Sequence, residues 1–364
     1  MKVVMTGGGT GGHIYPAIAI ADEIKRRYPD LEIVFIGAEI GMETTIVPDN
    51  GYEIILITAD GFSREHMSRN FKVLLRFGKG TLQARNILRK LRPDVVIGTG
   101  GYASAPVVRM AQSLNIPTYI QEQNAIPGVT NKFLESRATK VFLGFEKGSQ
   151  YFKHKEKHVV SGNPVRKNFT SVNRDEAREE LGFKPKDFVL LSFGGSQGAG
   201  RINKAMMEVV ETFNGVKDLK ICMATGGYYY KAILEELEEK GIQLESNISI
   251  IEYIKDMAKY LTAADLVVGR SGALSVAEIT MCGKPAIFIP SPIVSGNHQY
   301  YNAVAIEEKG GAKVIEEKDL EGKALSSEIL KLKNNPEILR DMSEKSAKCA
   351  PLRAAEIICD SIEF

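Results

Sequence analysis

The fold class follows from Lys2-Val-Val-Met-Thr-Gly-Gly-Gly-Thr-Gly-Gly-His-Ile-Tyr-Pro16, a short apolar run that passes through five glycines into a segment with helical spacing. The same order of features returns in Phe188-Val-Leu-Leu-Ser-Phe-Gly-Gly-Ser-Gln-Gly-Ala-Gly200. A strand, a glycine turn and a helix in this order present backbone N–H groups and a helix N-terminus to an anion. Two such units predict two α/β domains that face one cleft, with a phosphate-bearing group on each side.

Length and composition agree with two globular domains. The chain has 364 residues, of which 44% are hydrophobic and 25% charged. A single core rarely grows beyond about 250–300 residues. Four scattered cysteines without a Cys-x-x-Cys pair argue against a disulfide framework or a zinc site and favour a reducing compartment. Without a signal peptide or an apolar run of ~20 residues, we expect a cytoplasmic protein that is at most peripheral to a membrane.

Apolar runs alternate with helical stretches along the whole chain. Strands are expected at 2–5, 33–36, 54–57, 95–97, 118–120, 140–143, 158–160, 188–193, 220–224, 248–251, 266–269 and 285–290. Helices are expected near 14–27, 73–90, 105–114 and 131–136, and the tail from about 335 is helical in character. Strands that alternate with helices predict mostly parallel sheets, here two Rossmann-like, doubly wound domains.

The link between the two series of strands is Ser161-Gly-Asn-Pro-Val-Arg166, which has the glycine and proline of a connecting segment. We therefore predict an N-terminal domain over 1–161 and a C-terminal domain over 162–340. A helix over 341–364 is expected to pack back on the N-terminal domain. The linker is the candidate hinge.

Besides an anion site, the first glycine turn admits two other interpretations. Gly7, Gly9 and Gly12 satisfy the dinucleotide pattern G-x-G-x-x-G, and Glu39 lies near the place of a ribose-binding acid, so a nicotinamide-dependent oxidoreductase is one alternative. A tight turn without a ligand is another, although five glycines exceed what packing needs. His13 at the helix start has no use in a dinucleotide site. The chain lacks G-x-x-x-x-G-K-[ST], which disfavours a P-loop NTPase.

Further polar and glycine-rich clusters follow other expected strands. Gly98-Thr-Gly-Gly-Tyr102 and Gln121-Glu-Gln-Asn124 lie at the carboxyl edge of the first sheet, where ligands of doubly wound folds bind. In the second half, Arg270-Ser-Gly-Ala-Leu-Ser-Val-Ala-Glu278 suits a phosphate at its helix start and a ribose at Glu278. Ser275-x-x-Glu278 equally fits a helix capping box, so both interpretations stay open.

The segment 62–92 is strongly basic, with nine lysines and arginines against Glu65 and with apolar residues interleaved. Such a segment is typical of a surface for anionic lipid headgroups. The alternative is an ordinary helix with a solvated face and an apolar side in the core. Nucleic acid is disfavoured because few aromatic residues are available for stacking.

Six motifs occur together in an order that resembles the MurG family, the UDP-N-acetylglucosamine transferases of peptidoglycan synthesis. They are Gly-Gly-Thr-Gly-Gly-His-Ile-Tyr-Pro, Gly-Thr-Gly-Gly-Tyr, Glu-Gln-Asn, Gly-Asn-Pro-Val-Arg, Gly-Gly-Ser-Gln-Gly-Ala and Arg-Ser-Gly-Ala-Leu-Ser with its glutamate. The resemblance covers nearly the whole chain. Gln121 stands where the family often has His, and Ser275 where Thr is common.

The resemblance implies a GT-B glycosyltransferase that inverts the anomeric centre as it moves GlcNAc from UDP-GlcNAc to lipid I (undecaprenyl-diphosphate-MurNAc-pentapeptide), giving lipid II. It implies a peripheral enzyme on the cytoplasmic face of the membrane. Donor contacts would come from Asn124, Arg166, Ser196, Ile254, Ala273, Leu274, Ser275, Glu278 and Gln299. The first-domain substrate residues would be Thr10, Gly11 and Gly12, with Gly9, Gly100, Gly101 and Tyr102 at the acceptor diphosphate.

Two residues compete for the general base. His13 at a helix N-terminus favours a neutral ring that accepts a proton, and Glu122 is the alternative. No protein-held metal or other cofactor is expected, because helix ends and N–H groups can stabilise the leaving UDP and Asp-x-Asp is absent. A GT-B enzyme with a soluble acceptor, and a sugar-nucleotide sensor that binds without turnover, remain alternatives.

Overall fold

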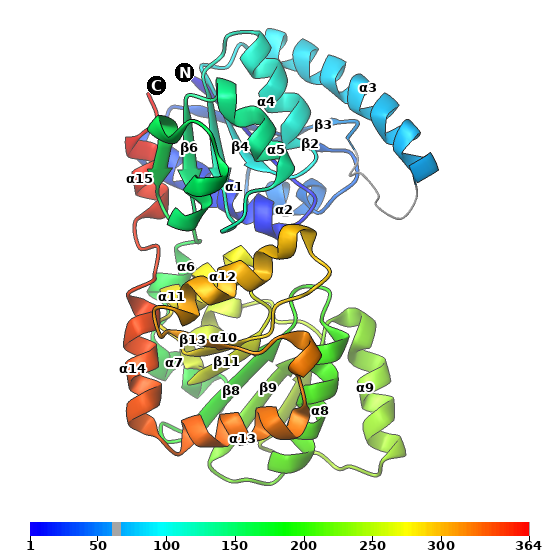
Figure 1. Ribbon diagram of the computed structural model, residues 1–364, viewed down its shortest axis with the longest axis vertical. Coiled ribbons are helices and arrows are strands. Elements are labelled where there is room, and N and C mark those ends of the chain that lie inside the picture. Colours follow the sequence, from blue (N-terminus) through cyan, green and yellow to red (C-terminus); the bar gives the residue numbers. More distant parts are fainter. Residues whose placement is uncertain (60–66, 364) are drawn as a thin grey trace. The chain divides into compact units, whose positions relative to one another are not determined.

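The computed structural model describes residues 1–59 and 67–363, which divide into two compact units (Figure 1). Unit 1 comprises Met1–Arg166 with Pro351–Phe364, and unit 2 comprises Lys167–Ala350. The chain therefore leaves unit 1 five residues beyond the predicted boundary at 161. It returns to unit 1 after Ala350, whereas the sequence suggested position 340.

In unit 1 the described residues form a seven-stranded parallel sheet in the order β3-β2-β1-β4-β5-β6-β7. The strands are β1 (Lys2–Gly7), β2 (Glu32–Ala38), β3 (Glu53–Ile57), β4 (Val95–Gly100), β5 (Thr118–Glu122), β6 (Lys140–Leu143) and β7 (His158–Val160). The helices are α1 (Gly11–Arg27), α2 (Glu43–Asp49), α3 (Met67–Leu91), α4 (Ser104–Ser113), α5 (Val129–Leu134) and α15 (Ala354–Asp360).

Alternate side chains of each strand point to opposite faces of the sheet, which gives unit 1 two hydrophobic layers. Val3 and Met5 of β1 are buried against α1 and α15. Val4 between them is buried on the other face, against Leu88 of α3 and Val107 of α4. Because both faces of the central strands are covered, β1, β2 and β4 are mostly apolar rather than alternating with polar residues, as is usual for parallel sheets.

The C-terminal tail forms two helices. α14 (Pro336–Ala347) belongs to unit 2, and α15 packs on α1 in unit 1 through the buried Ile358. Arg27 of α1 forms an ion pair with Asp360 at the end of α15. Pro351 lies between the two helices, and a proline cannot continue a preceding helix. Of the expected 341–364 helix, only the part from Pro351 onward belongs to unit 1, and within it α15 packs on α1.

In unit 2 the described residues form a six-stranded parallel sheet in the order β10-β9-β8-β11-β12-β13. The strands are β8 (Phe188–Phe193), β9 (Leu219–Ala224), β10 (Ile248–Ile251), β11 (Leu266–Gly269), β12 (Ala286–Phe288) and β13 (Ala312–Val314). The helices are α6 (Asn168–Ser171), α7 (Arg174–Glu180), α8 (Gly200–Phe213), α9 (Gly227–Glu239), α10 (Met257–Ala263), α11 (Ala273–Met281), α12 (His298–Glu307), α13 (Gly322–Lys333) and α14.

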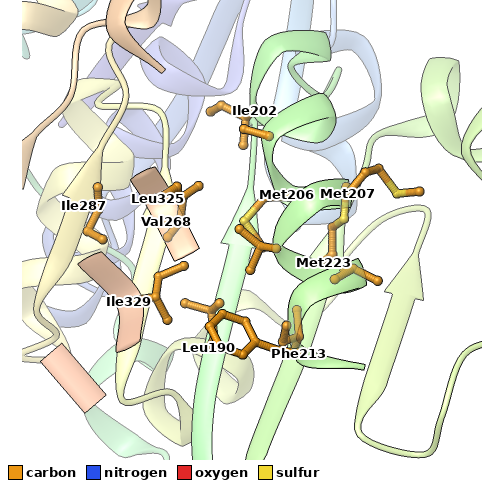
Figure 2. Close-up of a cluster of buried hydrophobic side chains, with 14 of the residues drawn as sticks. Leu190, Ile202, Met206, Met207, Phe213, Met223, Val268, Ile287, Leu325 and Ile329 are labelled. Atoms are coloured by element: carbon orange, nitrogen blue, oxygen red, sulfur yellow. The ribbon is translucent and has the colours of Figure 1, made fainter. Parts of the chain in front are cut away.

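Figure 2 shows the main core of unit 2, where Met206 and Phe213 of α8 lie over Leu190 of β8. Leu325 and Ile329 of α13 complete the same cluster, and all of these side chains are at most 5% exposed. Burial of this apolar surface is the main stabilising contribution to unit 2.

Each sheet reverses its strand order once, between β1 and β4 in unit 1 and between β8 and β11 in unit 2. In doubly wound folds, ligands bind beyond the carboxyl ends of the strands at this reversal. The glycine turns after β1, β4 and β8 and the Arg270–Glu278 motif after β11 lie at these places. The two doubly wound parallel-sheet units predicted from the sequence are thus confirmed.

Candidate functional site

Two glycine turns meet at the reversal point of unit 1. The Gly8 N–H donates to the Gly100 carbonyl oxygen at 3.3 Å. A Cβ at Gly101 would lie only 2.1 Å from the carbonyl oxygen of Gly8, so the two backbones are in direct contact. Glycine is required at this crossing because any side chain would push the turns apart.

His13 projects from the first turn of α1 and is held by one ring nitrogen. Its Nδ1 lies 3.0 Å from the Thr99 carbonyl oxygen and 2.9 Å from Gln123 Oε1. Both partners accept hydrogen bonds, so Nδ1 carries the proton, and in the neutral ring Nε2 keeps its lone pair. The ring is anchored in the tautomer that a general base requires.

The Gln123 amide is itself oriented by neighbours. Its Nε2 donates to the Thr99 carbonyl oxygen at 2.6 Å and to the side-chain oxygen of Gln121. Gln121 Nε2 donates in turn to Asn163 Oδ1 at 3.0 Å, and Asn163 Nδ2 donates to the Gln123 carbonyl oxygen at 2.9 Å. All three amides are at least 97% buried. This series of hydrogen-bonded amides orients Gln123 with its side-chain oxygen toward His13.

Glu122 lies in a different environment from His13. Its carboxylate is 2% exposed and accepts N–H groups from the Asn124 and Gly128 backbones at 2.9 and 3.0 Å. It also accepts from the amides of Asn124 at 3.2 Å and Asn131 at 2.9 Å. A carboxylate that accepts from four donors stabilises the loop after β5.

Gly9 was expected to face the acceptor diphosphate, and the structure directs its N–H elsewhere. This group donates to Glu43 Oε2 at 3.0 Å. The donors left at this turn are the first N–H groups of α1, at Gly11 and Gly12, which have no carbonyl partner within the helix. Thr10 is the N-cap and is exposed, without a side-chain capping bond.

Aromatic side chains support both ends of the same turn. The Arg166 guanidinium lies over the Tyr15 ring, 4.3 Å from its centroid. The Tyr102 ring packs on Gly9, where a Cβ would lie 2.6 Å from Tyr102 Cε1. The Tyr102 hydroxyl donates to the Ile40 carbonyl oxygen at 2.8 Å.

The acid considered for a dinucleotide ribose is engaged in other contacts. Glu39 Oε1 accepts from the Thr58 hydroxyl at 3.1 Å, and its other oxygen lies 4.0 Å from an Arg76 nitrogen of α3. These contacts join Glu39 to the residue after β3 and to α3, and its side chain is 45% exposed.

In unit 2 the turn after β8 leads into α8 at Gly200. Ser196 is exposed at the turn. Gly198 passes close to the end of β9, since a Cβ there would lie 2.0 Å from the Thr225 carbonyl oxygen. This close approach fixes the turn at the carboxyl edge of the sheet, directly before the start of α8.

The Arg270 turn is held by polar side chains from the following part of the chain. The Ser271 hydroxyl donates to the Gln299 carbonyl oxygen at 2.8 Å, and Asn302 Nδ2 donates to the Ser271 carbonyl oxygen at 3.2 Å. Gln299 Oε1 accepts the Ser291 N–H at 2.9 Å. Since the Gln299 side-chain oxygen faces Ser291, its N–H₂ group points away from Ser291.

Ser275 and Glu278 do not form the capping box that their spacing allowed. α11 begins at Ala273 with Gly272 as its N-cap, and no side chain caps it. Ser275 is therefore already in the first turn, too late to be the cap. Glu278 is 9% exposed and Ile254 is 4% exposed. No side chain caps the start of α11, and the phosphate interpretation of this helix start stays a prediction.

The structure thus gathers the predicted residues into two sets. Thr10, Gly11, Gly12, His13, Gly100, Gly101, Tyr102, Glu122, Asn124 and Arg166 lie in unit 1, and Ser196, Ile254, Ala273, Leu274, Ser275, Glu278 and Gln299 lie in unit 2. Sequence reasoning did not assign the partners Thr99, Gln123, Asn163 and Glu43. Thr99 and Gln123 lie inside recognised motifs, and Glu43 follows no recognisable pattern.

Metal clusters and membrane-spanning helices are both absent from the described ranges 1–59 and 67–363. Within these ranges, no group of three or more His, Cys, Asp or Glu side chains could hold a metal ion. No helix in the same ranges is long and apolar enough to cross a membrane.

The basic segment 62–92 lies partly outside the described residues, which omit 60–66 and the side chains of 67–75. Over the remainder of α3, Ala84 and Leu88 are buried in the core of unit 1. The cations are exposed at Lys79, Arg85, Arg89, Lys90 and Arg92. This half of α3 is amphipathic, with its basic side directed to solvent.

Comparison with known proteins gives a consistent result. Residues 3–143 match the glycosyltransferase family 28 N-terminal domain, and residues 189–357 match its C-terminal domain. The UDP-N-acetylglucosamine–N-acetylmuramyl-(pentapeptide) pyrophosphoryl-undecaprenol N-acetylglucosamine transferase of Caldicellulosiruptor saccharolyticus is 43% identical over 98% of this chain and 96% of its own. The transferase of the same name from Clostridioides difficile is 42% identical over 100% and 88%. The crystal structure of Acinetobacter baumannii MurG is 28% identical, with a TM-score of 0.76 over 99% of this chain and 98% of its own.

Proposed function

The chain is a member of glycosyltransferase family 28, and on that premise we propose that it transfers N-acetylglucosamine from UDP-N-acetylglucosamine to the N-acetylmuramyl-(pentapeptide) pyrophosphoryl-undecaprenol acceptor, lipid I. The likeness extends over both units and nearly the full length of the named relatives. It carries the GT-B fold and the transferase activity, and it leaves no role for the oxidoreductase alternative.

His13 is the general base in this proposal. The acceptor hydroxyl oxygen attacks C1 of the donor sugar, the bond from C1 to the UDP oxygen breaks, and the hydroxyl proton passes to His13 Nε2. One displacement of this kind inverts the anomeric centre. The observation that carries the assignment is the double anchoring of Nδ1 by Thr99 and Gln123, which leaves Nε2 as the proton acceptor.

Unit 2 holds the donor. Ser196 and Ser275, with N–H groups at the starts of α8 and α11, contact the diphosphate, and these positive helix ends stabilise UDP as it departs. Glu278 accepts the ribose hydroxyls and the Ile254 backbone meets uracil. Gln299, Ala273 and Leu274 contact the sugar.

Unit 1 holds the acceptor. The acceptor diphosphate accepts hydrogen bonds from the N–H groups of Gly11 and Gly12 at the start of α1, beside Gly100, Gly101 and Tyr102. Glu122 shapes the loop that presents Asn124. No metal ion held by the protein takes part in the step as proposed, since the helix starts supply the positive potential.

The base assignment is tested by His13→Ala and Glu122→Gln with UDP-GlcNAc and a lipid I analogue. For His13→Ala we expect kcat to fall by about 10²–10⁴ while the Kd of UDP stays within about twofold, because only the proton-transfer step loses its group. Glu122→Gln should lower the midpoint of thermal unfolding as well as the kcat of transfer. Near-normal turnover of His13→Ala at saturating substrates would exclude it as the base.

The acceptor's lipid brings the protein to the cytoplasmic face of the membrane, through the basic segment 62–92. The support is the exposed basic side of α3. Arg85, Arg89 and Lys90 changed together to Gln should weaken binding to vesicles containing anionic lipid, and about 0.5 M salt should abolish the difference. The same change at the exposed Lys217, Lys231 and Lys331 of unit 2 is the control. Equal binding of both variants at low salt would refute the membrane role of this segment.

A further inference from the structure

Glu43 is a buried acid next to the glycine turn that the proposed function gives to the acceptor. It is the first residue of α2 and is 0% exposed. Its Oε2 accepts the Gly9 N–H at 3.0 Å, and its Oε1 accepts the Ala38 N–H at 3.2 Å. One carboxylate therefore joins the turn after β1, the end of β2 and the start of α2.

Three glycines from separate segments leave room for this carboxylate. A Cβ at Gly8 or at Gly41 would lie 2.2 Å from a Glu43 oxygen, and a Cβ at Gly37 would lie 2.9 Å from Glu43 Cγ. The space is thus shaped around one side chain. Burying a carboxylate is costly unless it is hydrogen-bonded, so the site is built for the charged acceptor of two N–H groups.

Gly9 is held from both sides. Its φ is +88°, in the region that favours glycine, and its N–H faces Glu43. The Tyr102 ring covers the other side and its hydroxyl reaches the Ile40 carbonyl, in the same β2–α2 loop that leads to Glu43. The backbone of the turn is thereby fixed just before Thr10, Gly11 and Gly12.

We propose that Glu43 is a positioning residue for the acceptor diphosphate, an inference that rests on the proposed function. By holding the Gly9 N–H, the carboxylate sets the backbone direction from which Gly11 and Gly12 present their donors. It also withdraws the Gly9 donor and places a negative charge behind Gly8 and Gly9. The anion is consequently directed to the helix start rather than to the preceding glycines.

The direct test is Glu43→Gln. A glutamine offers one acceptor oxygen, and its N–H₂ would face the second backbone N–H, so only one of the two bonds can form. We expect the KM for a lipid I analogue to rise about tenfold, while kcat and the KM for UDP-GlcNAc change less than about twofold. Glu53→Gln, at an exposed position on β3, is the matched control and should leave both KM values unchanged.

A second variant separates positioning from loss of folding. Gly41→Ala pushes on the carboxylate from the β2–α2 loop and substitutes no residue of the turn after β1. It should raise the acceptor KM in the same way, and the double variant should add little further. An unchanged acceptor KM in both single variants overturns the inference, as does an equal rise of both KM values. Failure of the wild-type chain to transfer to lipid I would instead count against the proposed function.

Discussion

The His13 ring is held by hydrogen bonds at Nδ1. Its capacity to accept a proton therefore depends on the lone pair of Nε2. Thr99 and Gln123 both accept from Nδ1, so the ring is oriented by two bonds rather than one. Gln121 extends this support, because its side-chain oxygen receives the Gln123 amide. Gln121 does not titrate, so the orientation of Gln123 is independent of pH at a position where the resembling family often has a histidine.

Gln123→Met should lower kcat about tenfold and leave the donor KM within about twofold. The methionine fills the space but offers no oxygen to Nδ1, while Thr99 still holds the ring. Steady-state kinetics with saturating donor measure the effect. Gln112→Met is the control, because Gln112 is also buried and bonded, to the Leu134 carbonyl oxygen at 2.9 Å, but belongs to α4. An equal loss of kcat in both variants would indicate a general packing effect.

Among the elements, α10 ends in an unusual way. Lys284, which precedes β12, donates from Nζ to the carbonyl oxygens of Thr262 at 2.8 Å and Ala264 at 2.9 Å. The lysine thus satisfies carbonyls at the helix C-terminus. It is 8% exposed, and burial lowers the pKa of its ammonium to about 8, with a further contribution from the charge of Arg174.

This depressed pKa predicts a rise in the stability of unit 2 with pH. Below pH 8 both folded and unfolded chains bind the proton. Between pH 8 and the ordinary lysine pKa of 10.5 only the unfolded chain binds it, so the free energy of unfolding increases with pH, by up to about 3 kcal/mol. Urea unfolding at about pH 7.5, 8.5 and 9.5 measures this.

Lys284→Met supplies the reference for that experiment. It removes the titrating group, so the difference between wild type and variant should shift in favour of the wild type as pH rises. A difference that is constant from about pH 7.5 to 9.5 would show that the lysine keeps its ordinary pKa in the folded protein.

On the scale of the whole molecule, each unit has its own sheet and core. The core of unit 2 includes side chains of α8 and α13. In unit 1, α15 from the end of the chain packs on α1 and completes one side of the core. The donor residues proposed above are concentrated in unit 2. Binding of the donor nucleotide should therefore stabilise unit 2 more than unit 1.

UDP at about one hundred times its Kd should stabilise unit 2 by about 2.7 kcal/mol, since a ligand that binds only the folded state adds this much. Amide hydrogen exchange should show added protection around α8 and α11, and little in β1–β3. Glu278→Gln should weaken UDP binding by about 1.5–3 kcal/mol, the value of a hydrogen bond to a charged group. Protection confined to residues 1–166 would place the nucleotide in the wrong unit.

Much of the fold could be predicted because its signals are local. The apolar runs at 33–36 and 188–193 were recognised from sequence, and β2 and β8 occupy them with extensions of at most two residues. β13 and α2 were missed, because Ala312–Val314 is only three residues long and Glu43–Asp49 contains Pro48. The capping-box interpretation of Ser275 is wrong, because residue spacing alone does not determine where a helix begins.

What the sequence by itself determined are the two doubly wound units, the glycine turns at their reversal points and the family. These depend on hydrophobic periodicity and on glycine at close backbone approaches, which are read from neighbouring residues. The tertiary structure alone decided which atoms meet. Thr99 and Gln123 reach His13 from 86 and 110 residues away, and Glu43 reaches Gly9 across 34. Such contacts arise when parallel strands bring distant loops to one edge of a sheet, so no local pattern contains them.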